Sequence, residues 1–245
     1  MNSTNMFSIF TTFPALLVAF SEKNDGSMRF VDSLVDQGIL KNREKFLKIH
    51  GILPKSVVSA GLEHGDNVKL VSKMEAGKFI SRTDALVTNE KNLYLSITVA
   101  DCLTIFIYDP KQRAIALIHA GWRSLAANII KKTIKILKVK GSLPKDFLIG
   151  IGPGIGICHF EIQGDVWGEF KRYWEALENR DGKKFLDLKK IAQQQFILEG
   201  TKKENIEINT ECTYCEEKKY FSNRRDKSVP LKTMIAVIGM KKLTS

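Results

Sequence analysis

Three residues of this 245-residue chain have the side chains of a transition-metal site, namely His64, Cys102 and His119. Histidine is scarce, with four in the whole chain, yet two of them stand beside predicted strands. His64 precedes one apolar run, and His119 ends another at residues 114–118. Imidazole and thiolate ligands suit Zn²⁺, and three protein ligands leave a fourth position open, as catalytic zinc sites do. Spacing alone does not distinguish a metal site from the alternative, which is a buried core histidine, an inert cysteine and an unrelated loop histidine.

Asp101 lies directly before Cys102, at the end of the apolar segment 95–100. An ionised carboxylate that is buried without a partner costs several kcal/mol. We therefore expect Asp101 to meet a cation, hydrogen-bond donors or a substrate, and a nearby metal ion is one such partner. Asp101, Cys102 and His119 are the candidate catalytic residues.

A cysteine pair and an arginine pair follow in the C-terminal part. Cys212 and Cys215 form a Cys-x-x-Cys sequence that could bind a metal or act as a redox couple. Neither a second such pair nor a nearby histidine completes a zinc set, so we interpret both as reduced structural cysteines. Arg224 and Arg225 could bind phosphate or carboxylate through their guanidinium groups. The alternative is a surface turn that is solvated or paired with Asp226.

The glycine-rich segment 150–160 has the glycine density of an anion-binding loop. It matches neither a dinucleotide-binding fingerprint nor a P-loop, and Pro153 removes one backbone donor. We expect close backbone packing near the site.

Length and composition favour a single domain spanning residues 1–245. At 44% hydrophobic residues, the chain can bury a core without disulfides, and four cysteines suit a reducing cytoplasm. The apolar run 13–20 is short, contains Pro14 and lacks a basic leader, so we predict a first strand there. No apolar stretch reaches the roughly 18 residues of a membrane span. We expect a cytoplasmic protein without membrane insertion.

The formal charge of +11 makes anionic partners plausible. The basic residues are spread along the chain, however, and no series of aromatic residues is interleaved with them, as in proteins that bind single strands. A solvated basic surface without a specific nucleic-acid partner is the favoured interpretation. The oligomeric state cannot be read from these features.

Short runs of β-branched and aliphatic residues predict strands, and periodic runs predict helices. The segments 104–108 and 114–118 flank an Asp-Pro turn, which places them antiparallel. Because strands and helices mix without regular βαβ alternation, the sequence predicts an α/β (mixed α+β) layered fold with mixed or antiparallel sheets. The predicted strands are 16–20, 67–71, 94–99, 104–108, 114–118, 147–151 and 234–238, and the predicted helices are 42–49, 125–139, 166–177 and 188–199.

Read in order, these segments resemble the YfiH or laccase-domain family, also called multicopper polyphenol oxidases and peptidoglycan editing factors. The resemblance covers nearly the whole chain, and its most specific elements are Ala-Asp-Cys at residues 100–102 and His-Ala-Gly-Trp-Arg at 119–123. Further elements are His-Gly at 64–65, Asp-Ala-Leu-Val-Thr at 84–88, Gly-Pro at 152–153, Cys-Thr-Tyr-Cys at 212–215 and Arg-Arg-Asp at 224–226.

The resemblance implies a layered α-β-β-α domain with a zinc site at His64, Cys102 and His119. It implies phosphorolysis of adenosine, inosine, guanosine and methylthioadenosine, and adenosine deamination, with purine nucleosides and phosphate as partners. Members of the family that it resembles have an older assignment as copper-dependent phenol oxidases and are also linked to peptidoglycan quality control. The positions that depart from the family pattern include Lys23, Leu62 before the His-Gly histidine, Thr104 in place of a common proline, Ser124 in place of a common glycine, and His159 where a second cysteine is frequent.

The leading hypothesis is purine nucleoside chemistry at this zinc ion, with Asp101 as proton shuttle. Its phosphate-binding candidates are Lys23, Arg123, Arg224 and Arg225. A copper-dependent polyphenol oxidase ranks lower, because four histidines cannot build a trinuclear copper cluster. A third hypothesis is a Cys102–His119 dyad that cleaves an amide bond of peptidoglycan precursors. A fourth is a cell-wall or partner-binding protein that only retains the pocket.

Overall fold

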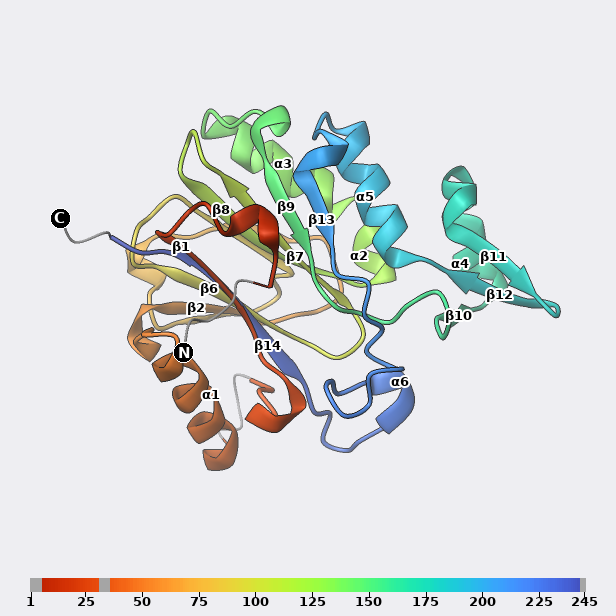
Figure 1. Ribbon diagram of the computed structural model, residues 1–245, viewed down its shortest axis with the longest axis horizontal. Coiled ribbons are helices and arrows are strands. Elements are labelled where there is room, and N and C mark those ends of the chain that lie inside the picture. Colours follow the sequence, from red (N-terminus) through yellow and green to blue (C-terminus); the bar gives the residue numbers. More distant parts are fainter. Residues whose placement is uncertain (1–5, 31–35, 243–245) are drawn as a thin grey trace.

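The apolar runs of the sequence form two main β-sheets in the computed structural model, which describes residues 6–30 and 36–242 (Figure 1). The five-stranded sheet has the order β1-β14-β6-β2-β4 and the six-stranded sheet the order β13-β9-β7-β8-β5-β3. The first comprises β1 (Leu16–Phe20), β2 (Val57–Ala60), β4 (Phe79–Ile80), β6 (Tyr94–Val99) and β14 (Met234–Met240); the second comprises β3 (Val68–Leu70), β5 (Ala85–Thr88), β7 (Leu103–Asp109), β8 (Ala114–Ala120), β9 (Leu148–Ile151) and β13 (Ile206–Ile208).

Strands β7 and β8 are buried on both faces, which explains their continuous apolar sequences. Phe106 and Leu117 belong to the core between the two sheets, whereas Ile105 and Ile118 belong to the core on the opposite face. The five-stranded sheet contributes residues such as Leu95 to the inter-sheet core. The two sheets therefore pack face to face.

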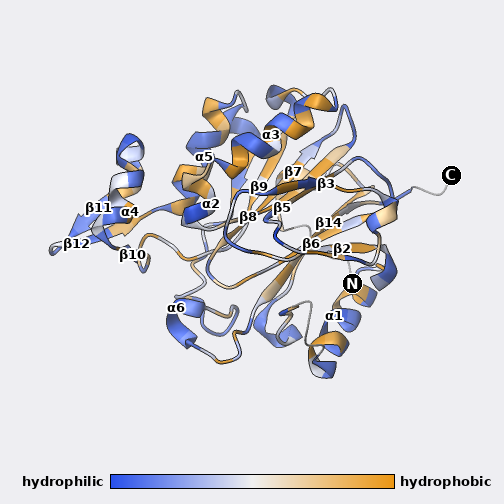
Figure 2. Ribbon diagram, turned by 180° about the vertical axis from the view of Figure 1, so that it is seen from behind, coloured by the Kyte–Doolittle hydropathy of each residue, from blue (hydrophilic) through white to orange (hydrophobic). Residues whose placement is uncertain are grey.

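Helices cover the outer faces of both sheets. Helix α1 (Gln37–Ile49) packs Phe46 and Leu47 against the five-stranded sheet. Helices α3 (Ile129–Val139) and α5 (Leu188–Leu198), with the short α2 (Trp122–Ala126), cover the six-stranded sheet. Figure 2 shows hydrophobic strands between helices whose polar sides face outward. This arrangement confirms the expected α-β-β-α layers with mixed and antiparallel pairing.

A third sheet extends from this body and was not predicted. It has the order β10-β12-β11 and lies with helix α4 in a lobe at the right of Figure 1. Its elements are β10 (Glu161–Ile162), α4 (Gly164–Glu169), β11 (Leu177–Arg180) and β12 (Lys183–Leu186). The predicted helix 166–177 is wrong in extent, because α4 ends at Glu169 and a 3₁₀ segment, Lys171–Ala176, follows it. Glycines at both ends of α4 weaken helix continuation there.

The predicted antiparallel hairpin is confirmed, since Tyr108 pairs with Ile115 across the 109–113 turn. The predicted helix 125–139 is divided, because Asn128 adopts a left-handed conformation between α2 and α3. Helix α1 starts earlier than predicted, where Asp36 caps it by accepting from two backbone N–H groups. Strands β2, β5 and β13 were missed because segments of three or four residues give no clear period. The short α6 (Asn223–Asp226) precedes β14.

Within the described ranges, no helix is long and apolar enough to cross a membrane. Strands from both ends of the chain also pair directly, with Val18 opposite Ile238 in the β1–β14 register. That all 245 residues form one domain stays a prediction.

Candidate metal centre

The metal-ligand candidates meet where the chain crosses from one sheet to the other. Residues 100–102 join β6 of the five-stranded sheet to β7 of the six-stranded sheet, so Cys102 lies at the edge between them. His119 has the same parity on β8 as Leu117 and therefore faces the inter-sheet side. His64 reaches this edge from the loop between β2 and β3, where its backbone is left-handed with φ 61°.

The ligand atoms of His64, Cys102 and His119 all lie within 4.8 Å of one another. The two imidazole rings are 4.9 Å apart and nearly perpendicular. His64 is exposed and His119 buried, so the cluster opens to solvent on one side. Two imidazoles and one thiolate fit zinc and leave a coordination position for an outside ligand. The structure thus brings the three predicted ligands together in a group that could hold a metal ion.

Asp84 is the central residue that the sequence analysis missed. Its Oδ1 lies 2.8 Å from His119 Nδ1, and both side chains are buried. The same carboxylate accepts from the backbone N–H groups of His64 and Gly65, each at 2.9 Å. A carboxylate on the far nitrogen of a ligand histidine fixes its ring and tautomer. The available signal was an aspartate placed directly before the buried strand β5.

The charges of this cluster shift the pKa values of its members. Burial alone would raise the pKa of Cys102, but His119 and His64 outweigh it and lower that pKa to about 6. Burial likewise opposes protonation of His119, yet Cys102 and Asp84 raise its pKa to about 9. The pKa of Asp84 is lowered, since the hydrogen bond and charge of His119 overcome its burial. The metal-free cluster therefore holds a thiolate beside an imidazolium.

Asp101 is buried, as expected, and its partners are hydrogen-bond donors. Its Oδ1 accepts from Thr213 Oγ1 at 2.6 Å, and its Oδ2 accepts from the Arg224 backbone N–H at 2.7 Å. Its backbone is left-handed with φ 86°, which is rare for a residue other than glycine. The C-terminal loop therefore holds Asp101 in a strained conformation next to Cys102.

A cavity of about 640 Å³ opens over the three ligands and Asp101. Four aromatic side chains and four arginines contribute to its wall: Phe30, Phe79, Trp122, Phe160, Arg29, Arg82, Arg123 and Arg224. Apolar walls with a few convergent polar groups are typical of small-molecule sites. Arg29 and Arg82 were not singled out from the sequence, because neither belongs to a recognisable motif.

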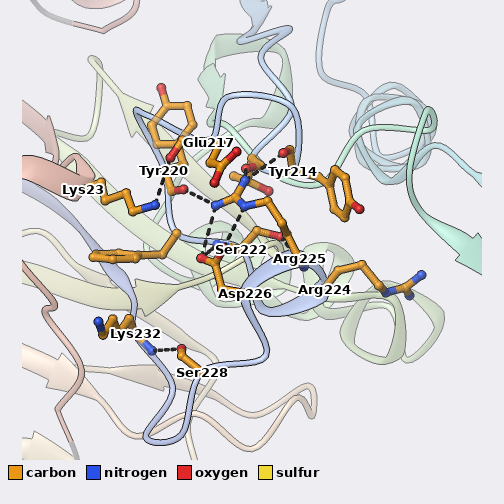
Figure 3. A network of polar contacts seen from close by, with 12 residues as sticks. Lys23, Tyr214, Glu217, Tyr220, Ser222, Arg224, Arg225, Asp226, Ser228 and Lys232 are labelled. Atoms are coloured by element: carbon orange, nitrogen blue, oxygen red, sulfur yellow. Dashed lines mark hydrogen bonds and ion pairs between the residues drawn. The ribbon is translucent and has the colours of Figure 1, made fainter.

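The four predicted substrate-binding residues divide into two pairs. Arg123 and Arg224 line the cavity, whereas Lys23 and Arg225 are not among its lining residues. The Arg225 guanidinium donates to the carbonyls of Thr213, Tyr214 and Tyr220 and pairs with Asp226, so all five of its N–H groups are used (Figure 3). Lys23 donates to the carbonyl of Glu217 and lies over the Phe221 ring.

The expectation that no nearby histidine completes a zinc set with Cys212 and Cys215 is wrong. Cys158 and His159 join them from another segment, and the four ligand atoms lie within 4.8 Å of one another. The histidine that seemed to be missing stands more than fifty residues earlier in the chain. Sequence proximity could not reveal it.

The glycine-rich segment next to this cluster packs closely, as expected. A Cβ atom at Gly150, Gly152, Gly154 or Gly156 would come within 3.1 Å of a neighbouring atom. The segment therefore lets the backbone approach β7 and the C-terminal loop.

Comparison with known proteins gives a consistent result. The family model for multi-copper polyphenol oxidoreductase laccase matches residues 24–241. Purine nucleoside phosphorylase YlmD of Bacillus subtilis (strain 168) is 29% identical, over 92% of this chain and 89% of its own. Purine nucleoside phosphorylase YfiH of Escherichia coli (strain K12) is 31% identical, over 77% of this chain and 76% of its own.

Solved structures agree with this match. The fold is similar to that of Bacillus licheniformis hypothetical protein YfiH, with a TM-score of 0.87 and 26% identity over 92% of this chain and 93% of that one. YlmD from Geobacillus stearothermophilus gives a TM-score of 0.89 at 24% identity, over 95% and 94% of the two chains. The chain therefore belongs to the YfiH/YlmD family of laccase-domain enzymes, whose curated members YlmD and YfiH are named purine nucleoside phosphorylases.

Proposed function

We propose that this protein is a zinc-dependent purine nucleoside enzyme that phosphorolyses adenosine, inosine, guanosine and methylthioadenosine and deaminates adenosine. The observation that carries the proposal is the position of His64, Cys102 and His119 in one wall of a cavity lined by arginines and aromatic rings. The names of the curated relatives support the substrate class. The four free cysteines suit a reducing compartment, so the proposal includes a cytoplasmic location.

The donor set supports zinc rather than copper at the first cluster. A mononuclear blue-copper site adds a weak axial ligand, commonly methionine, to its two histidines and cysteine. No methionine is among the described residues that line this cavity. A zinc ion held by His64, Cys102 and His119 would supply Lewis acidity and lower the pKa of a bound water.

The cavity wall offers separate groups for a base and for phosphate. Trp122 and Phe160 present aromatic surfaces on which a purine could stack. The Arg123 guanidinium lies over the Trp122 ring at 4.3 Å, and that of Arg224 lies over Phe160 at 5.5 Å. Each arginine is thus held beside an aromatic side chain. We assign phosphate binding to Arg123 and Arg224 and positioning of the C-terminal loop to Lys23 and Arg225.

Asp101 is the proposed proton-transfer group. Asp101 lines the cavity next to Cys102, and two donors fix the orientation of its carboxylate. In deamination it would pass a proton toward the departing ammonia, and in phosphorolysis it would protonate the departing base. The arginines would meanwhile orient phosphate toward the ribose C1′ atom, since phosphorolysis requires the two reactants to be held in line.

Product analysis with and without phosphate tests the proposal. Zinc-loaded protein incubated with adenosine and phosphate is expected to give adenine and ribose 1-phosphate, and without phosphate to give inosine and ammonia. Cys102→Ser keeps the shape of the side chain and removes the thiolate ligand, so both activities should fall together. If loaded wild-type protein turns over no purine nucleoside under either condition, the proposal is wrong.

The low pKa of Cys102 beside protonated His119 favours one second candidate, a cysteine hydrolase acting on an amide bond of peptidoglycan precursors. The two functions respond oppositely to chelation. Removing the metal should abolish nucleoside turnover, whereas it should expose the thiolate and activate amide cleavage. Amide hydrolysis that rises on chelation and disappears in Cys102→Ser would support the hydrolase.

A further inference from the structure

Four metal-binding side chains from two distant segments meet outside the first cluster. Cys158 and His159 lie between β9 and β10, and Cys212 and Cys215 lie between β13 and α6. We infer that Cys158, His159, Cys212 and Cys215 bind one zinc ion in a closed structural site. Three thiolates and one imidazole form a common structural zinc set, and four protein ligands leave no open position. This inference goes beyond the proposed function and does not rest on it.

Two of the six distances between the ligand atoms are close to the edges of a zinc tetrahedron, and all six are within 4.8 Å. With Zn–S near 2.3 Å and Zn–N near 2.0 Å, such edges measure about 3.8 Å between sulfurs and about 3.5 Å between sulfur and nitrogen. Cys158 Sγ lies 3.7 Å from Cys215 Sγ, and Cys215 Sγ lies 3.3 Å from His159 Nδ1. A disulfide would need sulfurs about 2.05 Å apart. The side chains are therefore spaced to share an ion.

The backbone around the cluster fixes these positions. Cys212 pairs with Gly154 in a parallel β-bridge, and the Gly156 N–H donates to Cys212 Sγ at 3.1 Å. A Cβ at Gly156 would lie 3.1 Å from Cys158 Sγ and 3.4 Å from Cys212 Sγ, so a side chain there would press on both sulfurs. Such N–H donors to a ligand sulfur are typical second contacts of metal sites.

The imidazole of His159 is oriented as well. It stacks on the Tyr214 ring with centroids 4.0 Å apart and an angle of 15° between the planes. In this orientation Nδ1 faces Cys215 Sγ. Tyr214 itself lies between the two cysteines of the Cys-x-x-Cys sequence, so the same loop supplies two ligands and the surface that holds a third.

The charge of the occupied site would be balanced locally. Zn²⁺ with three thiolates and a neutral imidazole carries one net negative charge. Lys189 is buried, donates to the carbonyl of Glu211 at 2.6 Å and interacts electrostatically with Cys212 and Cys158. A buried ammonium requires nearby negative charge. Cys158 and Cys215 are exposed, which gives an ion a path into the site.

The location of the site defines its role. It joins the segment leading to the lobe of β10, β11 and β12 to the loop that carries Thr213 and Arg224. Those two residues supply the hydrogen bonds to Asp101. An ion at the four ligands would thus hold the donors of Asp101 in place. Cys158, His159, Cys212 and Cys215 are positioning residues and do not touch a substrate.

Metal analysis of full-length variants prepared under reducing conditions tests the inference. Zinc-loaded wild type is expected to hold two zinc ions per chain, and Cys102→Ser to keep one after exhaustive dialysis. Adding Cys215→Ser to that variant should remove the remaining ion. Cobalt bound to Cys102→Ser should show a thiolate-to-cobalt charge-transfer band from three sulfurs. Its absorption intensity should be about three times that expected from a single thiolate ligand. A Cys102→Ser protein that retains no zinc would overturn the inference.

Replacements of His159 separate metal binding from simple packing. His159→Cys supplies another zinc ligand and should keep the ion, whereas His159→Ala should lose it. Chemical-shift changes at the Thr213 and Arg224 amides should accompany metal loss in His159→Ala and be absent in His159→Cys. Equal zinc content in both variants would contradict the role of His159 as ligand.

Alkylation of wild-type protein needs no substitution and covers the case in which variants fail to fold. Cys158 and Cys215 should resist iodoacetamide in the zinc-loaded protein and react after chelation, despite their exposure. Reaction at equal rates before and after chelation would overturn the inference. So would a mass decrease showing a Cys158–Cys215 disulfide in protein kept under reducing conditions.

Discussion

Asp84 Oδ1 lies 2.8 Å from His119 Nδ1, and both side chains are buried. The carboxylate also accepts from the N–H groups of His64 and Gly65. One side chain therefore orients two of the three candidate ligands, although it contributes no ligand atom to their cluster. This relationship makes Asp84 a sensitive position for metal binding.

Asp84→Asn should weaken zinc binding at the first cluster by about 10- to 100-fold. Asparagine keeps the shape of the side chain, but it has one acceptor oxygen in place of two, which cannot accept from His119 and from both backbone N–H groups. Its NH₂ group would face a donor instead of accepting a hydrogen bond from it. Competition with a chelator of known affinity measures the loss.

Asp66→Asn is the matched control, since Asp66 lies in the same loop and pairs with Lys132 at the surface. Its zinc affinity should stay within twofold of wild type, because exposed ion pairs contribute little. Equal affinity of Asp84→Asn and wild type would show that the carboxylate does not hold His119.

Gly121→Ala should reduce zinc affinity while leaving the fold intact. The Gly121 backbone has φ −78° and ψ 173°, which alanine adopts readily. However, the added Cβ would lie 3.0 Å from Cys102 Sγ, so this ligand atom must shift, whereas its 3.6 Å distance from His64 Cδ2 is an ordinary contact. Zinc titration followed by isothermal calorimetry checks the effect.

Gly168→Ala serves as its control. A Cβ at Gly168 has no neighbour within 4 Å, and the residue lies in helix α4. This change should leave zinc binding unchanged and raise the free energy of unfolding by about 0.5–1 kcal/mol. Identical zinc affinities in the two variants would mean that the first cluster tolerates the extra methyl group.

In metal-free protein, alkylation of Cys102 should stay fast as the pH falls from 8 to about 6. Its pKa is lowered to about 6, so the reactive thiolate is lost only below that pH. His119, with its pKa raised to about 9, stays protonated across this range and keeps the thiolate stable. Peptide mapping after iodoacetamide pulses at each pH measures the rate.

The His119→Asn variant provides the control. In His119→Asn the imidazolium is absent, and the alkylation midpoint of Cys102 should move above pH 8. An unchanged midpoint would argue against the thiolate–imidazolium pair.

Arg224→Ala and Arg225→Ala should have different consequences. Arg224 lines the cavity, so its loss is expected to raise KM for phosphate about tenfold, which corresponds to about 1.4 kcal/mol. Arg225 donates to three carbonyls and a carboxylate, so its loss should lower the free energy of unfolding by about 1.5–3 kcal/mol. Steady-state kinetics and urea unfolding separate the two.

Arg172→Ala is the control for both variants, because Arg172 is exposed and donates only to Asn128 among the described side-chain partners. It should change neither KM nor stability measurably. A rise in KM in Arg225→Ala without loss of stability would return that residue to the substrate-binding group.

The sequence by itself determined the chemical types of the first cluster and the strands that carry it. His64, Cys102 and His119 were recognisable because His64 stands just before an apolar run and the other two stand just after one, where buried strands meet the surface. Strands β7 and β8 were predictable because residues buried on both faces give continuous apolar segments. The layered architecture followed from the same patterns together with the family resemblance.

Only the tertiary structure decided which distant residues complete the two clusters. Asp84 meets His119 because β5 pairs with β8 in a register that places Ala85 opposite Ile118. Cys158 and His159 approach Cys212 and Cys215 because Gly154 pairs with Cys212. The different surroundings of Arg224 and Arg225 also emerged only there. These contacts join residues tens of positions apart, and strand pairing, which local sequence does not specify, sets them.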